Sequence, residues 1–561
     1  MAESFDLLIR GGTLADGTGA PPRLGDVAIR DGRIAALGDV RGPARETIDA
    51  SGQIVAPGFI DIHTHYDAQI LWDRTLSISP AHGVTSVVMG NCGFGVAPTR
   101  PQHRELILRT LENVEGMSFE ALAAGLGDDW PFESFPEYLS ALEGRGSLIN
   151  VGVMIGHTPL RTFVMGQDAT EREARPEEIA QMRSLVDEAL ESGALGFASS
   201  RSPTHVGHRG RPVPSRAASL NEIRTLAEGL RSSRHGVMQV TVGPELFMKE
   251  LTDLQPAIAS PITWTALLSG MGPRGSHRSF LEQSERLQRE GIEVYPQVSC
   301  RPLVFEFTFK APFVLESQPI FGPVSATDEA GKRRIYADPE FRTRLREARG
   351  FGTRWDSVVI ASHPSAPELA ERRLRELAEE RGTHPVDVAL DLALESDLEA
   401  RFRMEVMNTR EDEVAELLNH PSTVLGLSDA GAHASQLCDA CFSTHLLGHW
   451  VREKGALSLE KAVELLSSRA ARLFGLSDQG RLAPGLVADV VVFDPERVGC
   501  SPLRRVHDLP AGADRLVSDA IGIHAVIVNG VCIQKEGRGA LDLEGPLPGA
   551  LLRSPSVPSR K

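Results

Sequence analysis

Residues 58–65 read "GFIDIHTH", an apolar run that ends in two histidines one residue apart. The apolar part is typical of a buried strand, and residues two apart on a strand point to the same face. We therefore expect His63 and His65 to project together from the end of one strand. Two imidazoles on one face suit a borderline metal such as Zn²⁺. The stretch predicts half of a metal site, and the surrounding fold has to supply the other half.

Short apolar segments alternate with helical stretches such as "PEEIAQMRSLVDEALES" over roughly 400 residues. The strand candidates, in chain order, are "GFIDIHTH", "VTSVVMGNC", "LINVGVMIGH", "GALGFASS", "HGVMQVTVG", "PITWTALLSG", "GIEVYPQVS" and "STVLGLSDAGAH". Eight such units predict the α/β class and a (β/α)8 TIM-like barrel. A ninth run, "WDSVVIASH", is placed in an insertion. An open doubly wound sheet is the alternative, and the lack of a Gly-rich dinucleotide fingerprint after an early strand disfavours it.

The two ends of the chain have a different sequence pattern, in which Gly, Asp and Pro turn signals divide short apolar runs. Because domain termini often lie close together, we predict that residues 1–57 and 477–540 form one small β-sandwich domain. The barrel then spans residues 58–476. The tail, residues 541–561, is rich in Pro, Ser and Gly and is expected to be loosely ordered.

Bulk properties limit the classes of protein. The 561 residues carry a net charge of -16, which argues against a nucleic-acid-binding surface. Six cysteines in so long a chain do not make a disulfide framework, so a cytoplasmic location is expected. There is no signal-peptide pattern and no apolar run of about 18 residues, so no membrane association is expected. The expected partner is a small-molecule substrate, and an oligomer is left open.

Polar residues at the ends of the second and eighth predicted strands extend the metal site. Cys92 follows "VTSVVMGN", and Asp429 follows "STVLGLS". The carboxyl ends of barrel strands converge on one face. We therefore predict His63, His65, Cys92 and Asp429 as metal ligands. Asp429 is also the predicted catalytic base, which takes a proton from a metal-activated water and returns it to the leaving nitrogen.

Other strand ends supply candidates for the remaining catalytic steps. His157 and Tyr295 are predicted catalytic residues that stabilise the oxyanion of the tetrahedral intermediate. Arg161 and Arg201 are predicted to bind a substrate carboxylate, for which a guanidinium offers a bidentate partner. Ser299, at the end of the seventh strand, is the third predicted substrate-binding residue.

Several segments together resemble the amidohydrolase superfamily, in particular the N-acyl-D-amino-acid deacylases (D-aminoacylases). They are "APGFIDIHTHYD", "GVTSVVMGNCGFGVAP", "GALGFASS", "VYPQVS", "GLSDAGAH" and "GRLAPGLVADVVVFDP", and the resemblance covers roughly residues 5–540. It implies a metal-dependent barrel flanked by a β-sandwich built from both chain ends. It also implies hydrolysis of the amide C–N bond of an N-acyl-D-amino acid or similar N-acyl compound. In that family the His-x-His pair and the late Asp serve a weaker metal position, and a Cys with two further His make the tight zinc site.

Those two further histidines are absent. The fifth strand carries Gln239 and Thr241 at the expected place, and the sixth carries Thr265 and Ala266. The lysine expected to meet the substrate carboxylate is also missing. One ion, zinc or another divalent metal, is therefore predicted in preference to two. The alternatives are weak metal binding, or a substitute ligand from a further set of histidines: His157, His205, His208, His363 or His433.

Two other functions stay open. One is a single-metal hydrolase of cyclic amides or esters, or a decarboxylase or isomerase, on the same scaffold. The other is a catalytically silent ligand-binding homologue.

Overall fold

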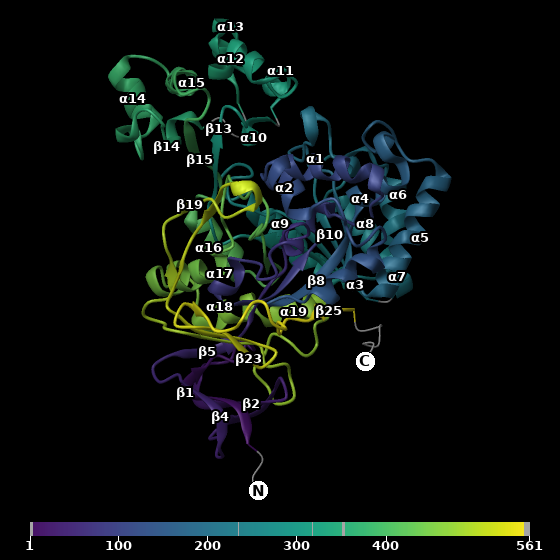
Figure 1. The fold of residues 1–561 in the computed structure, drawn as a ribbon, viewed down its shortest axis with the longest axis vertical. Helices are drawn as coiled ribbons and strands as arrows, with labels where there is room; N and C mark the ends of the chain where they lie inside the picture. Colours follow the sequence, from purple (N-terminus) through teal and green to yellow (C-terminus); the bar gives the residue numbers. More distant parts are fainter. Residues whose placement is uncertain (1–3, 234, 317, 350–353, 555–561) are drawn as a thin grey trace.

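The computed structural model of the chain describes residues 4–233, 235–316, 318–349 and 354–554 (Figure 1). Its centre is a sheet of eight neighbouring strands, each hydrogen-bonded in parallel to the next. A parallel bridge between Thr64 and Ala430 joins the first strand to the segment after the last, which closes the sheet. The predicted TIM-like barrel is confirmed. Its strands are β6 (Phe59–Asp61), β7 (Val84–Met89), β8 (Asn150–Gly156), β9 (Gly196–Ser200), β10 (Val237–Thr241), β11 (Ile262–Thr265), β12 (Val294–Val298) and β16 (Val424–Leu425).

Amphipathic helices cover the outside of the barrel. In α5 (Pro176–Ser192), Pro176 opens the helix with two acidic residues behind it, and Gly193 ends it at φ 111°. Its buried residues, Met182, Val186 and Leu190, recur at helical spacing and face the barrel. The other covering helices are α1 (Arg104–Glu115), α2 (Phe119–Leu126), α3 (Phe135–Arg145), α4 (His157–Met165), α6 (Leu220–Ala227), α7 (Gly229–Ser233), α8 (Met248–Ile258), α9 (His277–Arg289), α16 (Glu411–Asn419), α17 (Phe442–His445), α18 (Leu459–Leu466) and α19 (Ser468–Phe474). None of the helices in the described ranges is long and apolar enough to cross a membrane.

A large insertion between β12 and β16 stands at one end of the molecule, in teal and green in Figure 1. Its antiparallel sheet has the order β13 (Leu303–Thr308), β15 (Arg401–Met407), β14 (Val359–Ser362). The run "WDSVVIASH" supplies β14, so its placement in an insertion is confirmed. The helices are α10 (Phe313–Glu316), α11 (Gly322–Ser325), α12 (Glu329–Ala337), α13 (Pro339–Glu347), α14 (Leu374–Arg381) and α15 (Pro385–Glu395). They enclose a hydrophobic core separate from that of the barrel.

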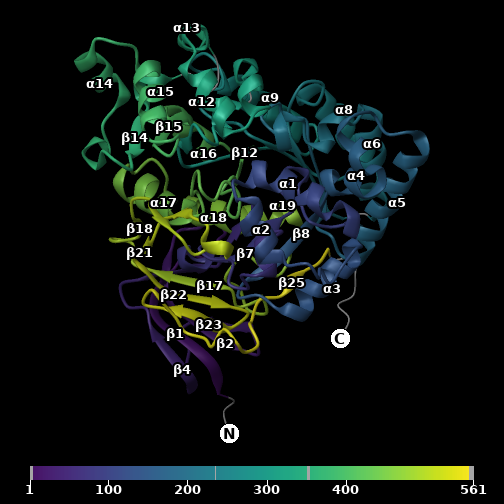
Figure 2. The same cartoon turned by 45° about the horizontal axis from the view of Figure 1, so that its top comes forward.

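A nine-stranded sheet combines both ends of the chain (Figure 2). The join is the antiparallel pairing of β5 (Ile54–Pro57) with β17 (Val490–Phe493). In β17, Val490 and Val492 enter the core of this sheet, whereas Val491 and Phe493 pack into the barrel core. The remaining strands are β1 (Phe5–Leu14), β2 (Arg23–Arg30), β3 (Arg33–Gly38), β4 (Ala44–Asp49), β22 (Ile523–Val528), β23 (Val531–Lys535) and β24 (Arg538–Gly539). The domain boundaries expected from the sequence, residues 1–57, 58–476 and 477–540, stay predictions.

The C-terminal segment differs from its prediction. Residues 541–554, expected to be loosely ordered, are held against the barrel by β25 (Leu551–Leu552), which pairs in parallel with β8. The reason is that β9 pairs only with residues 154–156 of β8, so the amino-terminal part of β8 has a free edge that β25 occupies. The Arg74 guanidinium also donates to the carbonyls of Leu543 and Gly545, at 3.2 Å each. The rest of the predicted tail, residues 555–561, lies outside the described residues.

Candidate active site

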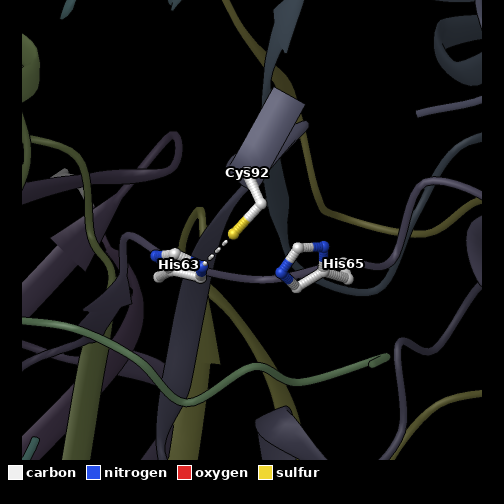
Figure 3. A group of neighbouring side chains, drawn as sticks. All are labelled: His63, His65 and Cys92. Atoms are coloured by element: carbon white, nitrogen blue, oxygen red, sulfur yellow. Dashed lines mark hydrogen bonds between the residues drawn. The ribbon is translucent and has the colours of Figure 1, made fainter. Parts of the chain in front are cut away.

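His63, His65 and Cys92 meet at the carboxyl end of the barrel (Figure 3). One ligand atom from each lies within 4.8 Å of the others, and Cys92 Sγ is 3.4 Å from His63 Nε2. Cys92 has φ 57°, in a short turn after β7. Gly90 precedes it at φ 87°, and a Cβ there would stand 2.1 Å from the Met154 carbonyl oxygen. The turn therefore needs glycine in order to direct the thiol toward the histidines.

Asp429, in the loop after β16, completes the cluster. Its Oδ1 lies 3.2 Å from His63 Nε2 and 3.7 Å from His65 Nε2. The structure thus brings together all four residues predicted as metal ligands. Burial raises the pKa of the Cys92 thiol, but the adjacent His63 and His65 outweigh it and lower that pKa to about 7. Burial likewise opposes ionisation of Asp429, but its contacts with His65 and His63 hold the pKa of its carboxyl well below the ordinary value.

Each histidine of the pair has a second residue beside its Nδ1 atom. Gln297 Oε1, on β12, is 2.8 Å from His63 Nδ1, and the Gln297 amide nitrogen donates to Thr263 Oγ1 at 2.5 Å. That second bond fixes the amide, so His63 Nδ1 donates and Nε2 faces the cluster. Glu115 Oε1, at the end of α1, is 3.4 Å from His65 Nδ1. Gln297 had no predicted role. Glu115 was not predicted as a site residue, because the sequence at a helix end does not indicate a partner across the barrel mouth.

The cluster lies at a cavity of about 310 Å³. Apolar side chains from the barrel loops and the insertion form much of its wall: Phe94, Val114, Val242, Leu268, Met271, Leu303, Phe305, Met407 and Leu427. The polar lining outside the cluster consists of Ser202, Thr204, His205, Thr241, Thr265, Ser299, Arg301, His433 and Asp439. A mainly apolar cavity with a few convergent polar groups is typical of a small-molecule site.

The fifth and sixth strands contribute no imidazole to this cavity. Thr241, Thr265 and Ala266 line it, and the two threonine hydroxyls are 3.2 Å apart. Gln239 is occupied on both sides, since its Oε1 accepts the Cys92 backbone N–H at 2.6 Å and its Nε2 donates to Thr265 Oγ1 at 3.4 Å. These positions offer hydroxyls and a methyl where a second zinc would need nitrogen or sulfur ligands.

Of the five histidines named as substitute ligands, His205 and His433 line the cavity. His157, His208 and His363 do not belong to its lining. His363 lies in the insertion, where its Nε2 is 3.3 Å from the Leu392 carbonyl oxygen.

The structure does not place His157 and Arg161 at the cavity where their predicted roles require them. His157 Nε2 is 2.8 Å from Glu222 Oε1, and Arg161 Nη1 contacts both Glu222 oxygens at 2.5 and 2.6 Å. All three side chains are fully buried away from the cavity. The physical reason is that α4 begins at His157, so these side chains follow the helix into its packing against α6 rather than the barrel mouth.

Arg201 and Tyr295, also predicted at the site, likewise lie outside the cavity lining. The Arg201 guanidinium donates to the carbonyls of Arg216 and Ala218 and pairs with Glu245 at 3.0 Å, outside the cavity lining. Tyr295 lies two residues before Gln297 on β12, too far from the carboxyl end of the strand, and packs with the Ala470 and Phe474 cluster. The predicted substrate-binding residue Ser299 does line the cavity.

The cavity also contains an ion pair absent from the sequence analysis. Arg301 Nε donates to Asp439 Oδ1 at 2.6 Å, and both residues belong to the lining. Both stand in loops beyond the ends of β12 and β16. Only the tertiary structure brings these two residues together, 138 positions apart in the chain.

The model of the amidohydrolase family matches residues 46–255 and 341–534. The chain belongs to the amidohydrolase family. The D-aminoacylase of Alcaligenes xylosoxydans xylosoxydans is 31% identical over 539 residues, which cover 95% of this chain and 96% of that protein. The N-acyl-D-glutamate deacylase of the same organism is 32% identical over 548 residues, with 95% and 94% covered. The expected resemblance to this branch is confirmed.

Solved structures agree with this placement of the amidohydrolase. An N-acyl-D-glutamate deacylase from Bordetella bronchiseptica, complexed with zinc and a phosphonate inhibitor that mimics the tetrahedral intermediate, has a TM-score of 0.69 at 28% identity, with 98% of this chain and 100% of that chain covered. A D-aminoacylase with a binuclear metal centre has a TM-score of 0.67, also at 28% identity and with the same coverage. Residues 256–340 of the chain, which the family model does not match, include β11 with Thr265 and the adjoining Ala266.

Proposed function

We propose that this amidohydrolase hydrolyses the amide C–N bond of an N-acyl-D-amino acid with one divalent metal ion, preferably Zn²⁺, held by His63, His65, Cys92 and Asp429. The single observation that carries the proposal is the four-donor cluster that lines a cavity of about 310 Å³. The named deacylase relatives support the choice of substrate.

The donor set fits zinc. Two imidazoles, a thiolate and a carboxylate are the ligands that Zn²⁺ prefers, and all four side chains meet in the described residues. An ion held there supplies Lewis-acid chemistry, which activates water and polarises the amide carbonyl. A count of one is supported by Thr241, Thr265 and Ala266, which bring no nitrogen or sulfur donor from the fifth and sixth strands.

Asp429 is the proposed proton carrier. Its carboxyl is ionised, and Oδ1 faces the two histidines, so the second oxygen takes the proton of the attacking water and delivers it to the leaving nitrogen. The products are a carboxylate and a free amino acid. The apolar side chains of the cavity wall lower the local dielectric and so strengthen the electrostatic interactions inside the cavity.

His205 replaces Tyr295 and His157 as the proposed oxyanion donor. Ser200 Oγ accepts the Ser202 N–H at 3.1 Å and lies 2.7 Å from His205 Nδ1. In the proposed arrangement the Ser200 hydroxyl donates to Nδ1, and the proton of the neutral ring is on Nε2. Burial lowers the pKa of His205 to about 3, which keeps the ring neutral. A neutral imidazole N–H in a mainly apolar cavity is a suitable donor to a developing oxyanion.

Metal content and a substrate panel test this proposal together. We expect about one zinc per chain by elemental analysis and hydrolysis of N-acetyl-D-amino acids, with both lost in His63→Ala. A metal content below about 0.2 per chain, with activity unchanged in His63→Ala, contradicts the proposed role of the cluster.

The second candidate function is hydrolysis of a cyclic amide or ester at the same ion. Thr241 and Ala266 favour it, because they line the cavity at positions where the family resemblance implies histidines. Cyclic imides and lactones in the same panel discriminate: cleavage of these with inert N-acetyl-D-amino acids selects the second candidate.

The proposed location is the cytoplasm. All six cysteines are free thiols in the structure, and most are buried, which suits a reducing compartment. The small-molecule substrate is the proposed partner.

A further inference from the structure

Residues 438–441 read "CDAC", two cysteines with two residues between them, at the point where the loop after β16 leads into α17. Cys441 Sγ lies 3.6 Å from the Cys438 carbonyl oxygen and is also hydrogen-bonded to the Cys438 thiol. Cys500, on β18 (Gly499–Cys500), contacts the Cys441 thiol as well. All three are free thiols, and none belongs to the metal cluster or to the lining of its cavity.

Cys438 is the member of the pair that a small reagent can reach. It lines a second, smaller cavity of about 30 Å³, and Asp429 and Asp439 of the main cavity line this one too. Such a volume holds about two water molecules, and hydrogen peroxide has two oxygen atoms. Cys441 is fully buried and lines neither cavity. Peroxide that enters the smaller cavity therefore meets Cys438 first.

The surroundings favour the thiolate of Cys438 over that of Cys441. The hydrogen bond from the Cys441 thiol lowers the pKa of Cys438, and the positive charge of Arg301 acts in the same direction. The same hydrogen bond raises the pKa of Cys441 to about 12. Arg301 lies among the thiols, with its Nη1 3.8 Å from Cys500 Sγ. A thiol of lowered pKa beside a second cysteine that can attack the oxidised sulfur is typical of redox-active pairs.

We propose that Cys438 and Cys441 are a redox-active pair, which hydrogen peroxide converts into a disulfide that lowers the activity of the enzyme by moving Asp439 away from Arg301. The Cys438 sulfur attacks one peroxide oxygen, the O–O bond breaks, and one water leaves, which produces a sulfenic acid. The Cys441 sulfur then attacks the Cys438 sulfur, so the S–S bond forms and the S–O bond breaks. The hydroxide leaves with the Cys441 proton as a second water. The two sulfurs lose two electrons, and the peroxide gains them.

Asp439 lies between the two cysteines in the chain and connects them to the active site. Its Oδ1 accepts from Arg301 Nε at 2.6 Å, and its carbonyl accepts the Phe442 N–H at 2.8 Å. A disulfide sulfur has no hydrogen to donate, so oxidation removes the bond from Cys441 to the Cys438 carbonyl. It also draws the two sulfurs into covalent contact. The loop 438–441 therefore changes shape, and the Asp439 side chain in the cavity wall moves with it.

The experiment treats the zinc-loaded wild-type enzyme with about one equivalent of hydrogen peroxide. Trypsin leaves Cys438 and Cys441 in one peptide, residues 411–452, and leaves Cys500 and Cys92 in two others. We expect peptide 411–452 to become lighter by two hydrogen atoms and to resist alkylation until dithiothreitol reduces it. Hydrolysis of N-acetyl-D-leucine should fall about tenfold or more and return with dithiothreitol. An unchanged zinc content separates this effect from oxidation of Cys92.

Two serine variants and one control identify the thiols. Cys438→Ser should form no disulfide and keep its activity in peroxide. In Cys441→Ser the sulfenic acid remains on Cys438, where dimedone traps it. Cys532→Ser removes a free cysteine on β23, away from the pair, and should behave as wild type. Circular dichroism and zinc content of each variant show whether the fold and the metal site are intact.

A readout without substrate measures the movement of Asp439. The Phe442 N–H, which is bonded to the Asp439 carbonyl, should exchange with deuterium faster in the oxidised protein than in the reduced one. A disulfide that instead joins peptide 411–452 to the peptide of Cys500 refutes the proposed pair. Unchanged exchange and unchanged hydrolysis in the oxidised protein refute the effect on Asp439.

The test of this site is independent of the function proposed above. If wild type cleaves no N-acyl-D-amino acid, the proposed function fails, while the peptide masses and the amide exchange still confirm or refute the redox-active pair. Equal loss of activity in wild type and Cys438→Ser would show that peroxide acts elsewhere, and would leave the proposed function standing.

Discussion

At the scale of single residues, the candidate metal site depends on side chains that do not themselves touch the ion's position. Gln297 Oε1 lies 2.8 Å from His63 Nδ1, and Glu115 Oε1 lies 3.4 Å from His65 Nδ1. Each partner holds an imidazole so that its other nitrogen faces Cys92 and Asp429. Without these partners, the four potential ligand side chains could adopt more conformations than a tight metal site allows.

Replacing Gln297 tests that argument. Gln297→Ala is expected to weaken zinc binding by about 10- to 100-fold, because His63 loses the acceptor that fixes its ring. Competition of the purified protein with a chromogenic zinc chelator measures the affinity. Gln288→Ala is the control, since Gln288 bonds to the carbonyls of Val294 and Ser422, away from the cavity. Equal zinc affinities in wild type and Gln297→Ala would show that the ring needs no such support.

His205 gives a second prediction at this scale. His205→Ala should lower kcat for the N-acyl substrate by about 10²-fold with a small change in KM, because an oxyanion donor acts mainly in the transition state. His205→Gln should restore part of kcat through its amide N–H. Steady-state kinetics give kcat and KM, and the zinc content is measured in parallel. His507→Ala, at an exposed position, serves as the control. A variant whose KM rises while kcat holds would assign His205 to ground-state binding instead.

At the scale of elements, strand ends determine which of the predicted residues the structure brings together. His63, His65, Cys92 and Asp429 could be predicted because the His-x-His spacing and the family resemblance place them at strand ends. Tyr295 lies outside the cavity because it stands near the start of β12, and alternation along a strand does not show which residue of the inward face reaches the barrel mouth. Arg161 lies outside it because α4 begins immediately at the end of β8.

Other parts of the site had no local signal at all. Glu115, Arg301 and Asp439 lie in helix ends or loops whose positions are set by tertiary packing. Likewise, the composition of the C-terminal segment predicts disorder, yet the free edge on β8 provides backbone partners that composition does not report.

That segment supports a prediction about stability. Leu552 of β25 packs with the cluster that contains Ala470 and Phe474. Leu552→Asp should lower the free energy of unfolding by about 2–3 kcal/mol, because it puts a charge into an apolar contact. Urea denaturation followed by fluorescence measures the change. Leu543→Asp, at a side chain that is 47% exposed, should change it by less than about 0.5 kcal/mol. Similar losses in both variants would mean that β25 adds nothing specific.

At the scale of the whole molecule, the candidate metal cluster lies across the closure of the barrel. His63 and His65 follow the first strand, Asp429 follows the last, and the Thr64–Ala430 bridge lies between them. An ion bound by both sides therefore joins the two ends of the sheet. The α/β class, the eight strands and the pairing of the chain ends could all be predicted from sequence, because strand and helix patterns alternate and turn signals recur along the chain. The closure of the barrel sheet depends on tertiary structure, which the sequence pattern does not show.

Metal removal tests this link. Dialysis against a chelator should abolish hydrolysis and lower the melting temperature, since an ion at about 1,000 times its Kd stabilises the native state by about 4 kcal/mol. Differential scanning calorimetry of the metal-free and zinc-restored protein gives the shift. Cys92→Ser should show a smaller shift on adding zinc, because the hydroxyl is a poorer ligand. An identical melting temperature with and without metal would exclude a structural contribution from the site.

The insertion between β12 and β16 has a hydrophobic core of its own, yet Leu303, Phe305 and Met407 from its sheet form part of the cavity wall. Because those side chains stand on a part whose packing is separate from the barrel, they can change over evolutionary time without disturbing the strands that carry the ligands. Mutations in the insertion can therefore change the substrate range among related proteins while the residues that carry out hydrolysis stay the same. Exchanging residues 303–408 between two relatives would transfer side-chain preference and leave the reaction itself unchanged.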